Sequence, residues 1–425
     1  MKFHFIPNWL NPKLPFYYGW IILFCVCCAG FARQGPAVAT LSIFISPIAS
    51  EFGWSFTAVS SAVSFGGILA AVSSPFLGLL LDKNGSRTIL CISILITGFT
   101  VMLISLTQSL FFFFTLFCIA RMNFAGPFDL GIYGAVNNWF IKLRGFATSV
   151  TTFIQMTGLM AMPLIAQACI QYDGWRFGWV IIGTTVLFIG FLPNFLLMVR
   201  KPEDLDLLPD GDHQSLNGND ENNTNLKNNK IPEPVFTRNE ALKTKAFWVL
   251  SVYTIFVFPV QAGISLHQAP HLIERGIDPY ITAKIIATFS LFSALSGLAF
   301  GLIVRKITIR FSLFSAALCL AFSSTIMIFI SVPWQGYLAA AFFGTGIGGI
   351  LTIIPIAWAD FFGRTSFGAI RGVALFFQVT AQASGPLMSG VLRDFSGDYY
   401  RSLIIFVVFS LSALFISLFA IPPKF

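Results

Sequence analysis

Three ionisable side chains, Arg33, Arg121 and Asp129, lie well inside long apolar stretches of this 425-residue sequence. A charge at the centre of a membrane-spanning helix costs about 2.5–3.5 kcal/mol on insertion scales, so each should face an interior cavity or a partner. Arg33 precedes Gly35 and Pro36, which favour a break in the helix. A fixed cation at a broken helix suits an anionic substrate, and we predict that Arg33 binds one. A structural hydrogen bond between helices is the alternative.

Arg121 and Asp129 share one apolar stretch. Eight residues of helix separate them by about 12 Å along the axis and about 80° around it, so they should not pair directly. We predict that Arg121 binds substrate. Asp129 is the best candidate for a proton carrier, because burial disfavours a charged carboxylate. A structural role, in which Asp129 neutralises a neighbouring cation, is the alternative.

Two glutamines occupy corresponding positions of an internal repeat. The offset that relates Gln155 to Gln378 also relates Gly78 to Gly301. Parallel repeats in transporters place a binding site between the halves, near the bilayer midplane. The two amides could therefore hold opposite ends of a small polar ligand, although packing between helices would also explain them.

Gln261 and His267 are further candidates for substrate binding. His267 and His271 are spaced four residues apart, as zinc ligands on a helix can be, but no third ligand is evident. We therefore expect no metal here. A titrating or substrate-bonding role suits His267 better.

The composition limits the class of protein that can hold these residues. The chain is 56% hydrophobic and only 10% charged, whereas a soluble domain carries roughly 25% charged residues. Lipid must therefore replace water around most of its surface. The seven cysteines lie in apolar runs without a C-x-x-C pair, so we expect neither a disulfide framework nor a cofactor site.

Apolar stretches long enough to cross a bilayer recur about twelve times. They fall near 20–43, 57–81, 88–106, 110–137, 146–170, 176–199, 246–272, 280–304, 311–330, 335–359, 372–393 and 402–421. We predict an all-α membrane protein with twelve transmembrane helices in two pseudo-symmetric six-helix bundles. Residues 1–199 would form the N-terminal half, 200–245 a partly disordered linker, and 246–425 the C-terminal half.

The basic residues predict the orientation. Most of them, including Lys83, Arg200 and Arg371, fall in segments on the side of the N-terminus, and few fall on the other side. Cytoplasmic loops carry such an excess, so we expect both termini in the cytoplasm and a multi-pass protein of the inner or plasma membrane. This placement accounts for the net charge of +8 without a nucleic acid partner.

The stretch Gly78-Leu-Leu-Leu-Asp82-Lys-Asn-Gly85-Ser-Arg87 resembles the signature loop G-x-x-x-D-R-x-G-x-R of the major facilitator superfamily of secondary transporters. The resemblance implies that Gly78, Asp82 and Arg87 form a gate that closes the cytoplasmic side. Physically, Asp82 can accept hydrogen bonds from a nearby helix N-terminus, and Gly78 permits close approach of helices. A polar turn that merely carries positive charge is the alternative.

Other segments resemble the monocarboxylate and oxalate/formate branch of this superfamily. They are Trp139-Phe-Ile-Lys-Leu-Arg-Gly145 and Gly385-Pro-Leu-Met-Ser-Gly390. The eighth helix departs from the animal monocarboxylate carriers, because it lacks their Asp and Arg pair and has only Lys284 near its outer end. In the superfamily, the arginine that Arg121 resembles is linked to proton movement or to holding helix one.

The resemblance implies a secondary transporter rather than an enzyme. We predict that it moves a small organic anion, with a monocarboxylate as one candidate, by alternating access, coupled to protons or to exchange of a counter-anion. It would act as a monomer in the bilayer, without a cofactor. Proton-driven efflux of an amphipathic, drug-like compound is the alternative.

Overall fold

The computed structural model describes residues 5–54, 56–211, 234–304 and 306–423. Helices dominate this part of the chain, and no strand occurs in it. Residues 212–233 of the expected linker fall outside the described residues. Side chains begin several of the helices by accepting a backbone N–H, as Ser109, Thr244 and Asp278 do.

The helices of the N-terminal part are followed by two short 3₁₀ segments. Their bounds are α1 (Phe5–Leu10), η1 (Asn11–Lys13), α2 (Gly19–Ala32), α3 (Val38–Phe52), α4 (Phe56–Asn84), α5 (Ser86–Ile104), α6 (Leu110–Ala125), α7 (Pro127–Trp139), α8 (Arg144–Thr185), η2 (Val186–Phe191), α9 (Leu192–Leu197), η3 (Pro202–Leu205) and η4 (Pro209–Gly211).

The C-terminal part is built from longer, mostly uninterrupted helices. Their bounds are α10 (Arg238–Lys243), α11 (Lys245–Glu274), α12 (Pro279–Ile303), α13 (Ile309–Ile328), α14 (Pro333–Phe362), α15 (Phe367–Ser396) and α16 (Tyr400–Ser417).

Within the described ranges, nine helical runs are long and apolar enough to cross a membrane. One of these, Arg144–Leu197, contains two spans, because Asp173 and Gly174 leave the helical conformation in its middle. The broken pair α2 and α3 and the more polar α15 complete the set. The predicted all-α class and twelve-helix bundle are confirmed.

Two spans are interrupted near their centres. The first breaks where expected, because α2 ends at Ala32 and α3 begins only at Val38, beyond Gly35 and Pro36. For the fourth, the expectation of a continuous helix from Arg121 to Asp129 is wrong. This span breaks at Gly126, because Pro127 has no N–H to continue the hydrogen-bond ladder and instead begins α7.

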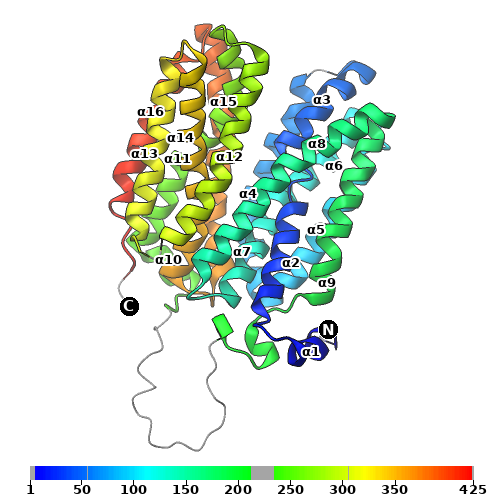
Figure 1. Ribbon diagram of the computed structural model, residues 1–425, viewed down its shortest axis with the longest axis vertical. Coiled ribbons are helices and arrows are strands. Elements are labelled where there is room, and N and C mark those ends of the chain that lie inside the picture. Colours follow the sequence, from blue (N-terminus) through cyan, green and yellow to red (C-terminus); the bar gives the residue numbers. More distant parts are fainter. Residues whose placement is uncertain (1–4, 55, 212–233, 305, 424–425) are drawn as a thin grey trace, which may run out of the picture.

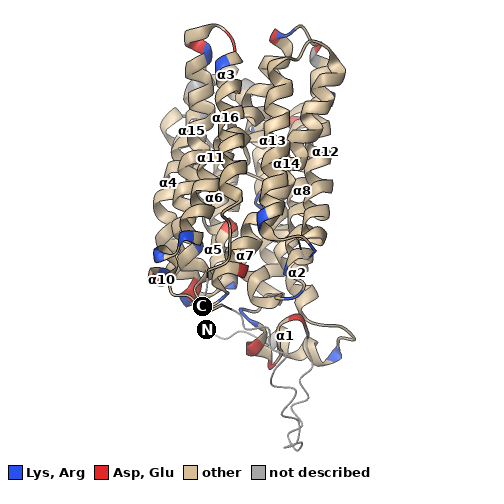
Figure 2. Ribbon diagram, turned by 90° about the vertical axis from the view of Figure 1, so that its left-hand side faces the viewer, with Lys and Arg blue, Asp and Glu red and all other residues tan. Residues whose placement is uncertain are grey.

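The helices gather in two groups that stand side by side (Figure 1). One group contains α2–α9 and the other contains α10–α16, and both termini lie at the same lower end, which we call the basal end. Charged residues concentrate at the two ends, while the middle is almost free of them (Figure 2). The predicted bounds of the two halves and the linker stay a prediction.

Two glycine pairs bring the groups into close contact. A Cβ atom on Gly78 would overlap the backbone of Gly368, and one on Gly145 would lie 2.6 Å from the carbonyl oxygen of Gly301. Small residues of this kind let helix backbones approach closely in membranes. The internal repeat equates Gly78 with Gly301 and Gly145 with Gly368, so the α4–α15 and α8–α12 crossings are symmetry mates.

Candidate functional site

Asp129 lies between two arginines from different parts of the chain. Its Oδ2 accepts a hydrogen bond of 3.2 Å from Nη2 of Arg371, and its Oδ1 lies 3.6 Å from Nη2 of Arg33. The side chains of Arg33, Asp129 and Arg371 are 12%, 9% and 2% exposed. Because Asp129 is on α7 and Arg371 on α15, this buried ion-pair network joins the two groups of helices.

The position of Arg371 corrects the prediction that this residue lies in a cytoplasmic segment. The helix α15 begins at Phe367, so Arg371 lies one turn inside it and is buried. The uncharged apolar stretch starts only after Arg371, whereas the helix itself starts earlier. The sequence indicates only that a buried Asp129 should have a cationic partner. It does not indicate which residue that partner is.

Arg33 is held by contacts to two further helices. Its Nε donates to the carbonyl oxygen of Phe124 at 2.9 Å, and its Nη1 donates to Oε1 of Gln155 at 3.2 Å. Nε2 of Gln155 in turn lies 3.5 Å from the hydroxyl of Tyr133. Two predicted substrate-binding residues, Arg33 and Gln155, are therefore in direct contact.

Arg121 is buried next to this network. Its Nε and Nη1 have no hydrogen-bond partner among the described residues. The guanidinium carbons of Arg121 and Arg33 lie 4.2 Å and 4.6 Å from the centroid of the Phe124 ring. One aromatic ring thus contacts both cations, an arrangement that stabilises them only modestly.

The cluster of Arg33, Arg121, Arg371 and Asp129, hereafter the arginine cluster, holds three positive charges and one negative charge. Buried charges are costly unless they are paired and hydrogen-bonded. Asp129 lies in ion pairs, which matches the structural alternative for this residue. Its role as a proton carrier stays a prediction. The arrangement as a whole is suited to an anion.

The remaining polar candidates lie in the C-terminal group. Oε1 of Gln261 accepts from Nε2 of Gln382 at 2.9 Å, while Gln378 is buried and its Oε1 has no partner among the described residues. Neither Gln261 nor Gln378 is hydrogen-bonded to the arginine cluster. The predicted grip of Gln155 and Gln378 on one ligand stays a prediction.

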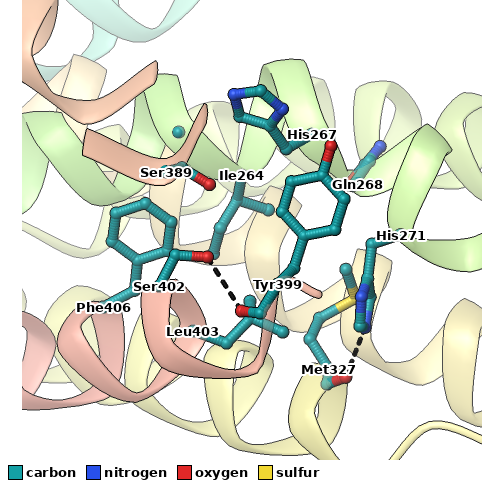
Figure 3. A pocket seen from close by; sticks show the side chains of 11 residues that line it. Ile264, His267, Gln268, His271, Met327, Ser389, Tyr399, Ser402, Leu403 and Phe406 are labelled. Atoms are coloured by element: carbon teal, nitrogen blue, oxygen red, sulfur yellow. Dashed lines mark hydrogen bonds between the residues drawn. The ribbon is translucent and has the colours of Figure 1, made fainter. Parts of the chain in front are cut away.

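His267 belongs to a separate small cavity of about 10 Å³, large enough for about one water molecule. Its Nε2 lies 3.2 Å from the carbonyl oxygen of Pro386, and its ring packs on Tyr399 (Figure 3). Nε2 of His271 bonds the carbonyl oxygen of Met327 instead. No cluster of three or more His, Cys, Asp or Glu residues that could hold a metal ion occurs in the described part of the chain.

The signature loop makes the contact expected of it. Oδ1 and Oδ2 of Asp82 accept the backbone N–H groups of Gly368 and Ala369, each at 2.8 Å, at the start of α15. Arg200 donates to the carbonyl oxygen of Asp82. Arg87 donates to the carbonyl oxygen of Phe195, within its own group of helices. The gating role of Gly78, Asp82 and Arg87 stays a prediction.

Two further ionic contacts cross between the groups at the basal end. Arg144 of α8 pairs with Asp360 of α14. Arg364 donates to the carbonyl oxygen of Asn138 at 3.1 Å and to Glu203 at 2.7 Å. Together with the glycine crossings, these contacts hold the basal end closed.

The comparisons with known proteins agree with this architecture. The family model described as Major Facilitator Superfamily matches residues 22–386. A solved bacterial homologue of the iron transporter ferroportin, in an outward-facing state, superposes with a TM-score of 0.72 at 12% identity, over 95% of this chain and 99% of that one.

Three curated relatives cover most of the chain. The membrane sensor protein UhpC of Salmonella typhimurium is 24% identical over 85% of this chain and 82% of its own length. Human monocarboxylate transporter 2 is 19% identical over 90% and 81%. The oxalate:formate antiporter of Oxalobacter formigenes is 23% identical over 90% and 86%. The predicted family and branch are confirmed.

The contact of Asp82 predicts the effect of Asp82→Asn. The amide keeps one acceptor oxygen but loses the charge and the second acceptor, so closure of the basal end should weaken by about 1–3 kcal/mol. We expect slower turnover in proteoliposomes, with equilibrium binding of the transported substrate within a few-fold of wild type. Asp394→Asn, the same change on an exposed acid at the far end of α15, should leave both unchanged. Loss of binding by purified Asp82→Asn would instead place Asp82 in the substrate site.

Proposed function

This chain belongs to the major facilitator superfamily and is a transporter of that family, and from that premise we propose that it carries a small organic anion across the membrane by alternating access. The observation that carries the proposal is the arginine cluster, in which three buried guanidinium groups share one carboxylate.

The donors of the arginine cluster match the acceptors of a carboxylate. Nε and Nη1 of both Arg121 and Arg371 are buried without a partner among the described residues. A guanidinium group presents its N–H donors in a planar fork that binds a carboxylate through two parallel hydrogen bonds. The Phe124 ring beside two of the arginines offers an apolar surface for the rest of a small organic acid.

The curated relatives support a carboxylate as the substrate. One is named for monocarboxylates and another for oxalate and formate. The excess of positive charge argues against efflux of a cationic drug, because a like charge in a poorly solvated site is repelled strongly. One chain holds the whole cluster, so we propose that a monomer transports.

Because its basal end is closed, we assign this structure to one state of the transport cycle. We assign this end to the cytoplasm, since the basic loop residues concentrate there. In this state the site would open to the outside, and rocking about the Gly78–Gly368 and Gly145–Gly301 crossings would reverse its access.

Exchange of anions is the mode of coupling that the arginine cluster favours. An empty carrier would have to enclose two uncompensated positive charges while it returns, and burial of unpaired charge is costly. A bound anion reduces that cost in both directions of movement. Asp129, whose oxygens lie at Arg33 and Arg371, is poorly placed to act as an independent proton carrier.

Arg121→Gln tests the anion site directly. A hydrogen bond to a charged group contributes about 1.5–3 kcal/mol, so binding of a labelled carboxylate should weaken by about ten- to hundredfold. Arg121→Lys should be intermediate, because a point charge lacks the planar fork. The fold should tolerate the change, since two donors of Arg121 have no partner to lose. Lys284→Gln, at an exposed position of α12, is the matched control, and uptake at the wild-type rate by Arg121→Gln would refute the assignment.

Coupling can be tested with proteoliposomes that are either empty or preloaded with unlabelled substrate. Exchange predicts fast uptake of labelled carboxylate into preloaded vesicles and little uptake into empty ones, with or without a pH gradient. Asp129→Asn should not change that dependence on preloading. Accumulation in empty vesicles driven by a pH gradient would contradict exchange. Its loss in Asp129→Asn or in His267→Gln would then identify the proton carrier.

A further inference from the structure

A polar cavity of about 280 Å³ lies at the basal end between the two groups of helices. It shares no lining residue with the arginine cluster. Its charged and hydroxyl-bearing lining includes Asp82, Ser86, Arg200, Lys201, Glu203 and Arg364. These residues come from α4, α5, the segment after α9 and the loop before α15. The cavity is therefore formed only when these segments are in contact.

The two acids of this cavity are already engaged. Both carboxylate oxygens of Asp82 accept N–H groups of α15. Oε1 of Glu203 accepts a hydrogen bond of 2.7 Å from Arg364. Arg364 is engaged by Glu203, and Arg200 donates to the carbonyl oxygen of Asp82. The three basic residues outnumber the two acids, so the lining keeps a net positive charge.

Ser86 adds a buried donor to this lining. The residue is only 1% exposed, and its Oγ has no hydrogen-bond partner among the described residues. A buried polar group that is left unpaired destabilises the folded state. Such a hydroxyl on the wall of a polar cavity indicates an occupant that accepts its hydrogen.

The backbone beside Ser86 adds to the attraction for an anion. Ser86 is the first residue of the 19-residue helix α5, whose N–H groups and dipole favour negative charge at this end. Gly85 precedes it with φ +80°, and a Cβ there would lie 2.6 Å from Cγ of Arg200. Glycine at this turn therefore lets the Arg200 side chain lie across the start of the helix.

We propose that this basal cavity binds a phosphate group, which holds the basal end closed. Guanidinium and ammonium groups, a hydroxyl and a helix N-terminus are the donors that phosphate sites combine. The volume of about 280 Å³ far exceeds what one water molecule needs and is enough for a phosphate and its immediate substituents. A free phosphate, a phosphate ester and an anionic lipid headgroup share this chemistry.

The position of the cavity gives its occupant a regulatory effect. Opening of the basal end separates Arg364, on the C-terminal side, from Ser86 and Asp82 on the N-terminal side. The phosphate group therefore binds the closed state selectively, and a ligand that binds one state shifts the population towards it. On the basal side, phosphate acts as an inhibitor of transport and not as cargo.

The test measures the melting temperature of the purified full-length protein in detergent against inorganic phosphate, at constant ionic strength. Phosphate stabilises the wild type, because binding to the folded state alone raises stability. Lys201→Gln and Ser86→Ala each weaken the apparent affinity roughly fivefold, which corresponds to about 1 kcal/mol. Lys306→Gln, which removes the same charge from an exposed site outside the cavity, changes the affinity less than about twofold.

Two further variants distinguish phosphate binding in this cavity from a loss of folding stability and from binding at the arginine cluster. Without phosphate, Ser86→Ala is as stable as the wild type, because its hydroxyl has no partner to lose. Arg121→Gln keeps the phosphate response, since Arg121 belongs to the arginine cluster. The proposal is overturned if Arg121→Gln abolishes the response while Lys201→Gln keeps it, or if Lys201→Gln and Lys306→Gln weaken it equally.

Nanodiscs identify the source of the phosphate group. If the occupant is a soluble anion, free phosphate stabilises the protein equally in zwitterionic and in anionic lipid. If it is a lipid headgroup, anionic lipid stabilises the wild type but not Lys201→Gln and removes the response to free phosphate. Either result supports the site, whereas no stabilisation by phosphate and none by anionic lipid contradicts it.

Discussion

A single buried carboxylate placed between two arginines is the constraint on which this structure depends. Asp129 on α7 reaches Arg33 at the break of the first span and Arg371 on α15. Breaking a buried ion pair by removing one partner is strongly destabilising, commonly by about 3–5 kcal/mol. The ion pairs of Asp129 therefore join the two groups of helices in the interior of the protein. Arg121 lies beside them and has no carboxylate partner among the described residues.

The glycine crossings determine how closely the groups can approach around that network. Gly78 against Gly368 and Gly145 against Gly301 leave no room for a side chain, so two pairs of backbones meet at the basal end. The internal repeat relates the two glycine pairs. The same type of helix contact therefore occurs twice in the interface between the two groups of helices. The hydrogen bonds of Asp82 to the start of α15 then lie directly beside one of these crossings.

Much of the architecture could be predicted from local patterns. Apolar length predicts the spans, Gly35 and Pro36 predict the break in the first one, and the position of Asp82 predicts its contact with a helix N-terminus. The partners of Asp129 could not be predicted, because Arg371 is 242 residues away and no periodicity relates the two. The break at Gly126 is hidden for a different reason, since the apolar stretch runs through it without a change in composition. Local features such as helix spans and breaks can thus be predicted from the sequence. Contacts between the two halves depend on packing and cannot.

The claim that the arginine cluster serves an anion is tested most directly by ligand-dependent stability of the purified protein. A panel should pair small organic acids, such as lactate, formate and oxalate, with amphipathic cations at equal concentration and ionic strength. Because a ligand that binds the folded state selectively raises its melting temperature, one or more organic acids should stabilise the protein and the cations should not. Stabilisation by the cations alone would contradict the account.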